Sequence, residues 1–99
     1  DPALSYGLGE FAAMITAMET AGYSRRDLHP HGGHMIALHI VVGLGLGGSE
    51  AYPGVFAPIG GYASDCTVDE GGVGPGSAPG FGLESKADLA PHITELTAD

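Results

Sequence analysis

The sequence predicts an α/β fold whose parallel strands end at one rim, and the spacing of an acid, a base and a second acid supports this prediction. Asp1, His31 and Glu50 each follow or lie in a short extended stretch. One strand–helix unit needs about 20 to 30 residues to return to the same face of a parallel sheet, which is close to the gaps between these three residues. We therefore expect their side chains to converge at one edge of the sheet.

The first half of the chain alternates between helix and strand patterns. Apolar residues recur at helical spacing and predict a helix over 6–21, with Gly22 as a left-handed stop. A short strand over 27–30 follows. The apolar run 35–42 is compatible by periodicity with a buried helix or a buried strand, and the preceding alternation favours the helix, which Gly43 or Gly45 would end.

The second half is rich in glycine and proline. A last short strand is predicted over 47–51, where Pro53 stops it, and alternating residues around a glycine turn predict a hairpin over 66–73. A terminal helix is predicted over 86–97, where Pro91 is tolerated only in the first turn. We divide the chain into an α/β part, 1–52, and a C-terminal tail, 53–99.

The composition of the chain bears on which partners the protein can bind and on the cellular compartment in which it works. Twelve acidic against three basic residues give a formal charge of -9, which makes nucleic acid an unsuitable partner. The single cysteine, Cys66, cannot form an intrachain disulfide, and the longest apolar stretch, 35–42, is too short to span a bilayer. We expect a cytoplasmic protein without membrane contact.

Two local motifs have alternative interpretations. The glycines of GLGLGG at 43–48 match a dinucleotide fingerprint, but no helix is predicted directly after them, so we interpret them as a tight connection. His29, His31 and His34 are close enough in sequence to share a zinc ion, and the trio lacks a nearby acidic partner other than Asp27.

Three further histidine assignments follow from position in the predicted helices. For His34 and His39, which are five residues apart on the predicted apolar helix, we favour core histidines, or histidines beside the site, that bond to the backbone. His92 is expected at the surface of the terminal helix.

Several segments together resemble the C-terminal part of the mandelate racemase subgroup of the enolase superfamily, and most closely its tartrate and acid-sugar dehydratases. The similar segments are PHGGH at 30–34, GLGLGGSEAYP at 43–53, and PGFGLE at 79–84 with Lys86 and the DL pair at 88–89. The resemblance covers nearly the whole chain.

The resemblance implies a fold and a set of partners. It implies the C-terminal portion, about strands six to eight, of a (β/α)8 barrel, with a tail that packs on an α+β capping domain outside this chain. It implies Mg²⁺ as cofactor, whose carboxylate ligands, together with a lysine acid/base, would precede residue 1. It further implies a small-molecule carboxylate substrate and a homo-oligomeric full-length protein. We expect no metal ligand and no cofactor-binding residue within residues 1–99, and little stability or activity of this portion by itself.

The resemblance also assigns catalytic roles to three residues. Asp1 and His31 would form a hydrogen-bonded dyad, and Glu50 would stabilise the developing enolate. The reaction expected is dehydration of a hydroxy-diacid or acid sugar through removal of the proton α to a carboxylate, with His31 as general acid or base. A racemase or epimerase of the same superfamily is the alternative, and a truncated chain without activity is a third possibility.

Overall fold

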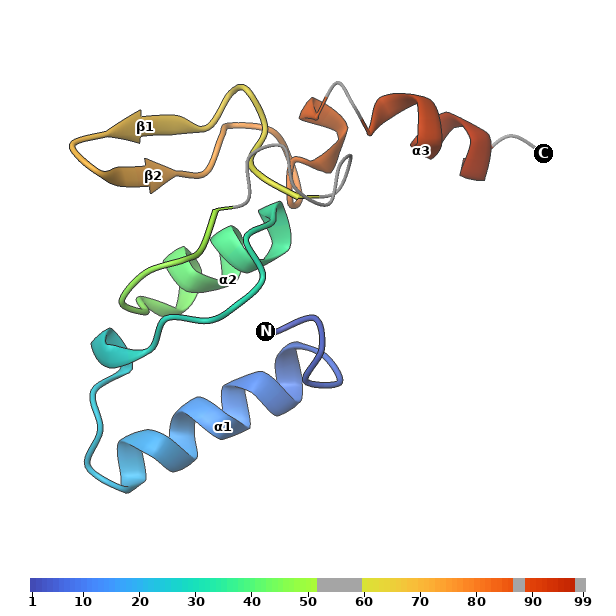
Figure 1. Ribbon diagram of the computed structural model, residues 1–99. Coiled ribbons are helices and arrows are strands. Elements are labelled where there is room, and N and C mark those ends of the chain that lie inside the picture. The colour runs from blue at the N-terminus through green and yellow to red at the C-terminus, as the bar shows by residue number, and fades with distance from the viewer. Residues whose placement is uncertain (52–59, 87–88, 98–99) are drawn as a thin grey trace.

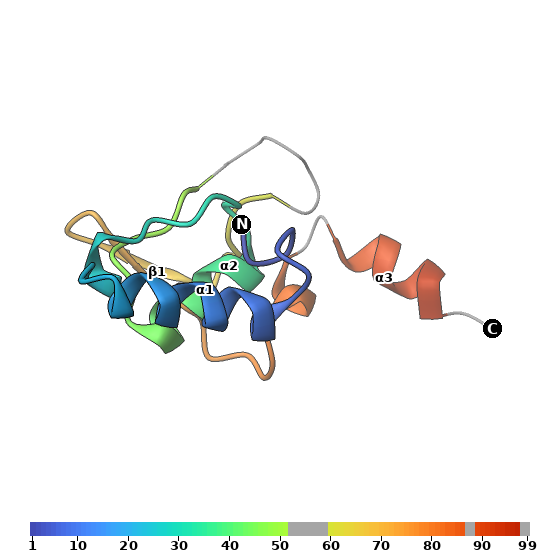
Figure 2. The ribbon, with the colours of Figure 1, turned by 90° about the horizontal axis from the view of Figure 1, so that it is seen from below.

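The structure, a computed structural model, describes residues 1–51, 60–86 and 89–97. These residues form three α-helices, two 3₁₀ helices and one small antiparallel sheet (Figure 1). The order along the chain is α1 (Leu8–Thr20), η1 (Arg25–Asp27), α2 (Met35–Leu44), β1 (Thr67–Asp69), β2 (Gly72–Gly74), η2 (Leu83–Ser85) and α3 (Ala90–Thr97). In both ribbon views α3 extends away from α1 and α2 (Figures 1 and 2).

The fold class predicted from the sequence was wrong. The segments 27–30 and 47–51, both expected to be parallel strands, contain no strand. The only sheet among the described residues is the antiparallel pair β1 and β2, and isolated bridges join His34 to Gly60 and Gly61. These residues therefore do not form the C-terminal portion of a (β/α)8 barrel with its tail.

Local contacts explain why the first of these segments is not a strand. The Ser24 hydroxyl accepts a hydrogen bond from the Arg26 N–H at 3.1 Å and starts the 3₁₀ turn η1, which includes Asp27, the first residue of the expected strand. A backbone bond from the Gly47 N–H to the Leu28 carbonyl, 2.9 Å long, joins the two segments. A parallel ladder needs several such bonds in register, and most of these two segments is irregular backbone instead.

Both long helices end as the sequence predicts. At the end of α1 the Tyr23 N–H donates to the Met18 carbonyl and the Gly22 N–H donates to the Glu19 carbonyl, with Gly22 at φ 93°. This pair of bonds is the Schellman arrangement, which requires a left-handed residue. Gly45, at φ 65°, ends α2 in the same way. The predicted stop at Gly22 and the predicted helix over 35–42 are confirmed.

The core lies between α1 and α2. Phe11 and Ile15 of α1 are buried against Ile40 and Val41 of α2 and against Leu46, which follows α2. Each such side chain contributes roughly 1.5 to 3 kcal/mol when fully buried. The contact between these two helices therefore fixes the loop that precedes α2 and the segment that follows it.

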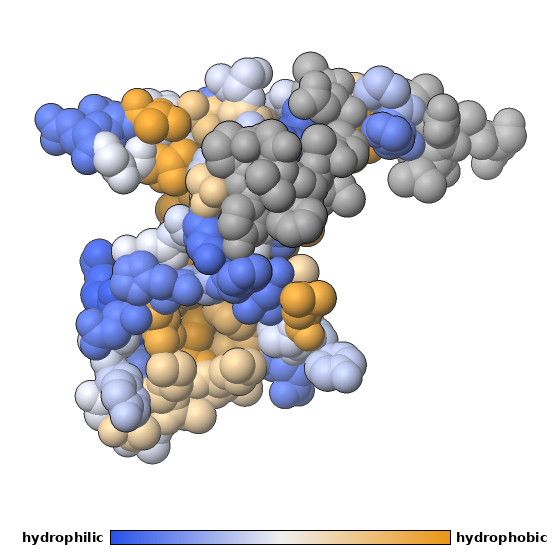
Figure 3. Space-filling model, viewed as in Figure 1, coloured by the Kyte–Doolittle hydropathy of each residue, from blue (hydrophilic) through white to orange (hydrophobic). Residues whose placement is uncertain are grey.

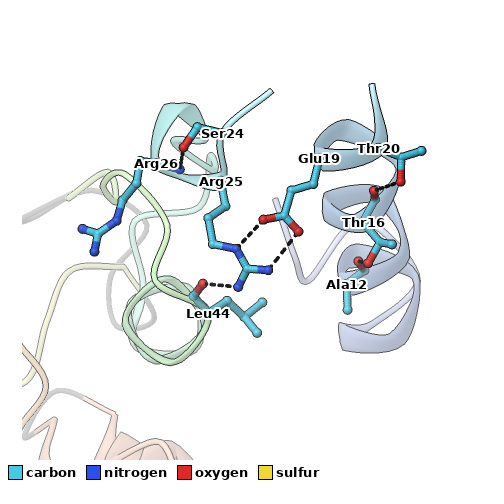
Figure 4. Close-up of polar contacts among 8 residues, drawn as sticks. All are labelled: Ala12, Thr16, Glu19, Thr20, Ser24, Arg25, Arg26 and Leu44. Carbon is cyan, nitrogen blue, oxygen red and sulfur yellow. Dashed lines mark hydrogen bonds and ion pairs between the residues drawn. The ribbon is translucent and has the colours of Figure 1, made fainter. Parts of the chain in front are cut away.

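A salt bridge connects the C-terminal ends of α1 and α2 (Figure 4). The Arg25 guanidinium donates to both carboxylate oxygens of Glu19, at 2.7 and 2.9 Å, and to the Leu44 carbonyl at 2.9 Å. The hydrogen bond between these two side chains lowers the pKa of Glu19 and raises the pKa of Arg25. The guanidinium N–H groups of Arg25 are therefore bonded within the fold, to Glu19 and to the Leu44 carbonyl.

The predicted hairpin and terminal helix are also present. β1 pairs with β2 in the register Thr67–Gly74, Val68–Val73 and Asp69–Gly72, with the turn at Glu70 and Gly71. α3 begins at Ala90, so Pro91 lies in its first turn, as expected. The terminal helix is shorter at its start than predicted, because η2 and the Lys86 region precede it.

Apolar side chains also remain at the surface of α1. Leu8 and Met14 are about half exposed, and Met18 is 37% exposed. The apolar colours on the lower part of the molecule in Figure 3 include this region. Within the described residues, no helix has the length and apolar character needed to cross a membrane.

Candidate functional site

His31 and Glu50 lie together at the entrance to α2. The loop 30–34 comes directly before this helix in the sequence, and Glu50 follows the helix in the sequence. In space, Glu50 returns to the loop that precedes the helix. The Nε2 atom of His31 is 3.5 Å from Oε2 of Glu50. The same carboxylate oxygen accepts a hydrogen bond of 3.1 Å from the Gly32 N–H. A backbone donor and an imidazole therefore converge on one oxygen, which suits a negatively charged carboxylate.

The two side chains remain accessible to a ligand. His31 is 69% exposed and Glu50 is 39% exposed. An acid/base pair that acts on a bound substrate must present its titrating atoms to that substrate, so this exposure is compatible with catalysis. It also means that solvent weakens the attraction between the two charges.

Asp1 lies against His34. Oδ1 of Asp1 is 3.8 Å from Nε2 of His34, and both side chains are mostly buried. The sequence resemblance assigns a dyad to Asp1 and His31. In the structure Asp1 instead faces His34, and His31 faces Glu50. Gly32 lies between the two pairs, because a Cβ on it would be 3.4 Å from Oδ2 of Asp1 and 3.2 Å from Nε2 of His34.

His34 has a structural role that defines its protonation state. Its Nδ1 accepts a hydrogen bond of 3.1 Å from the Ala37 N–H, which caps the N-terminus of α2. Since this nitrogen is the acceptor, the proton of the neutral ring is on Nε2, the atom that faces Asp1. Burial lowers the pKa of His34 and so favours this neutral form.

Backbone geometry at the loop requires glycine. Gly32 has φ 142° and Gly33 has φ 58°, and neither conformation suits a residue with a Cβ. The sequence predicted a turn at the pair Gly32 and Gly33. It did not show that the Gly32 N–H would hold Glu50.

Tyr62 is a part of the site that sequence reasoning missed. Its hydroxyl donates to the Glu50 carbonyl and lies 3.2 Å from the Ser49 hydroxyl. These contacts hold the Glu50 carbonyl and the Ser49 side chain. A tyrosine in a glycine-rich stretch gives no periodic or motif signal that could have identified it.

The other histidines have separate surroundings. Nδ1 of His29 is 3.1 Å from the Asp27 carbonyl, and its ring lies against Gly47 and Gly48. His39 packs edge to face on Phe81 with 5.7 Å between ring centroids, and its Nε2 is buried without a hydrogen-bond partner among the described residues. The expected backbone bond is confirmed for His34 and not for Nε2 of His39. His92 is exposed, as predicted.

Neither alternative motif gains support from the geometry. In residues 1–51, 60–86 and 89–97, no three or more His, Cys, Asp or Glu side chains are grouped so that they could hold a metal ion. The glycine run 43–48 ends α2 and is followed by turns and coil up to residue 51, where a dinucleotide site would need a helix.

No protein-family model matches this chain. The observations that bear on function are the geometry around His31 and Glu50 and the sequence resemblance.

Proposed function

We propose that this chain carries acid/base residues of a hydro-lyase that dehydrates a hydroxy-diacid or an acid sugar of the tartrate type. His31 is the general acid/base, and Glu50 is its charged partner. The observation that carries the proposal is the 3.5 Å contact between Nε2 of His31 and Oε2 of Glu50 on an accessible surface. The resemblance to acid-sugar dehydratases supplies the substrate class.

The proposed chemistry uses His31 as a proton donor. The lysine that the resemblance implies outside this chain would accept the proton α to the substrate carboxylate, and the electron pair left behind expels the β-hydroxyl group. Nε2 of the His31 imidazolium gives its proton to that hydroxyl, which leaves as water, and an enol forms on the substrate. The Glu50 carboxylate stabilises the imidazolium before the transfer, and the Gly32 N–H keeps that carboxylate in position.

Asp1 has a positioning role in this proposal. Its carboxylate faces Nε2 of His34, and His34 caps α2 through its other ring nitrogen. Asp1 and His34 therefore hold the loop on which His31 stands. A change at Asp1 would act on His31 through this loop.

Mg²⁺ enters the proposal through the resemblance alone. The described residues do not fit a Mg²⁺ site, since they contain no group of three or more suitable side chains. The proposed compartment is the cytoplasm, because the one cysteine, Cys66, leaves no partner for an intrachain disulfide.

The test is turnover of a panel of tartrates and acid sugars, with Mg²⁺ present, by the native protein that carries this chain. We expect His31→Asn to lower dehydration by about 100-fold to 10,000-fold, the usual contribution of general acid–base catalysis. His92→Asn is the matched control, because it makes the same substitution at an exposed histidine of α3 and should leave turnover unchanged.

Two results would count against the proposal. Near-normal dehydration by His31→Asn would remove His31 from the mechanism. Exchange of the α-proton with solvent deuterium, without loss of a hydroxyl group from any substrate of the panel, would point to a racemase or epimerase.

A further inference from the structure

A cavity between the end of α2 and the hairpin has one charged residue in its lining. It encloses about 470 Å³, within the usual range of small-molecule sites. Its lining includes Arg26, the glycines 45, 47 and 48 and the hairpin residues 71–73. Among the described residues of its wall there is no Asp or Glu, in a chain that has twelve acidic residues.

Arg26 is set apart from the two other basic residues of the chain. Arg25 is bound to Glu19 and to the Leu44 carbonyl, and the buried Lys86 amine donates to the Gly60 carbonyl at 2.9 Å. The Arg26 side chain, in contrast, points away from the Arg25 pair in Figure 4, and its guanidinium bonds to no described residue. Its five N–H donors are therefore available to a ligand.

Two backbone N–H groups of the lining are further candidate donors. Gly48 and Ser49 line the cavity, and their backbone N–H groups donate to no residue in the described part of the chain. A guanidinium combined with backbone N–H groups is the arrangement that proteins use for carboxylate and phosphate groups. The remaining wall includes apolar side chains of α2.

We propose that this cavity binds a small oxyanion, a carboxylate or a phosphate, through the Arg26 guanidinium and the backbone of residues 48–49. The carboxylate or phosphate oxygens would accept two parallel bonds from the guanidinium. The inference is independent of the function proposed above, because it uses neither His31 nor Glu50.

Titration calorimetry of the full chain at low ionic strength, with succinate and inorganic phosphate as separate probes, tests the proposal. Saturable binding of either probe is expected, and the probe that binds more tightly identifies the carboxylate or the phosphate as the natural group. Arg26→Gln should weaken this binding by about tenfold or more, and Arg26→Lys should weaken it less, because lysine keeps the charge and loses the planar fork.

Ala13→Glu is the matched control for Arg26→Gln. It changes the net charge by the same amount at an exposed position of α1 outside the cavity, and binding should stay as in the wild type. Glu70→Gln, at the hairpin turn beside the cavity, should tighten binding because it removes a nearby negative charge. Circular dichroism checks that each variant is folded.

Three outcomes would overturn the proposal. The first is the absence of saturable binding of both probes by the wild type. The second is unchanged binding by folded Arg26→Gln. The third is an equal loss in Ala13→Glu, which would show that net charge and not the cavity determines the interaction.

Discussion

Gly47 is placed where the fold leaves no room for a side chain, and Gly47→Ala should therefore destabilise the chain. A Cβ at this position would lie 2.0 Å from the Arg26 carbonyl oxygen and 2.8 Å from Cε1 of His29. A backbone carbonyl cannot rotate away as a flexible side chain can. The two segments would have to separate by about 1.4 Å to reach ordinary van der Waals contact. This movement would also stretch the 2.9 Å bond from the Gly47 N–H to the Leu28 carbonyl.

The expected loss in the free energy of unfolding is about 2 to 4 kcal/mol. Roughly 1 kcal/mol comes from the broken hydrogen bond and about 1 to 3 kcal/mol from overpacking. Urea unfolding followed by circular dichroism measures it. Gly43→Ala is the control, because a Cβ there has no neighbour within 4 Å, and alanine should stabilise α2 by about 0.5 to 1 kcal/mol. A Gly47→Ala chain as stable as the wild type would refute the packing described for this loop.

Three further predictions concern the candidate site. His34→Ala should lower the free energy of unfolding by about 1 kcal/mol in urea denaturation, because the Ala37 N–H loses its cap, whereas His34→Asn should keep most of it. The pKa of His34 is lowered in the folded state, so the unfolded state binds more protons, and stability should be fully present above about pH 6.5 and fall as the pH drops below it. His34→Asn should show a smaller fall in the same titration, and an identical pH profile would contradict this assignment. In turnover assays Glu50→Gln should be milder than Glu50→Ala, since the amide oxygen can still accept bonds from His31 and from the Gly32 N–H, and the alanine variant should lose about 100-fold or more because His31 loses its partner. Equal losses in both variants would contradict the role of Glu50.

Local sequence signals predicted the helices and the hairpin of this fold. The helical spacing around Phe11 and Ile15, the left-handed stops at Gly22 and Gly45, and the glycine turn of the hairpin each act over a few residues. The predicted strand over 27–30 was wrong because a strand is stable only with its neighbours. The bond of Ser24 to Arg26 begins η1, which takes in Asp27, and residues 28–30 lie in no strand.

The candidate site could be predicted in part. The sequence suggested that His31 and Glu50 converge, and the structure places them 3.5 Å apart although the strands expected to carry them are absent. The partner of Asp1 could not be predicted, because it depends on how the loop before α2 turns at Gly32 and on the ring orientation of His34. Tyr62 reaches Glu50 across a distance in sequence that no local pattern encodes.

The central claim is that His31 and Glu50 act as one acid/base unit, and a double-mutant cycle on dehydration tests it most directly. The measurement is kcat/KM of the native protein that carries this chain, of His31→Asn, of Glu50→Gln and of the variant with both changes. If the two side chains act together, the double variant should be about as slow as His31→Asn alone. Losses that simply multiply, in variants that remain folded, would show that the two residues act separately and would contradict the account.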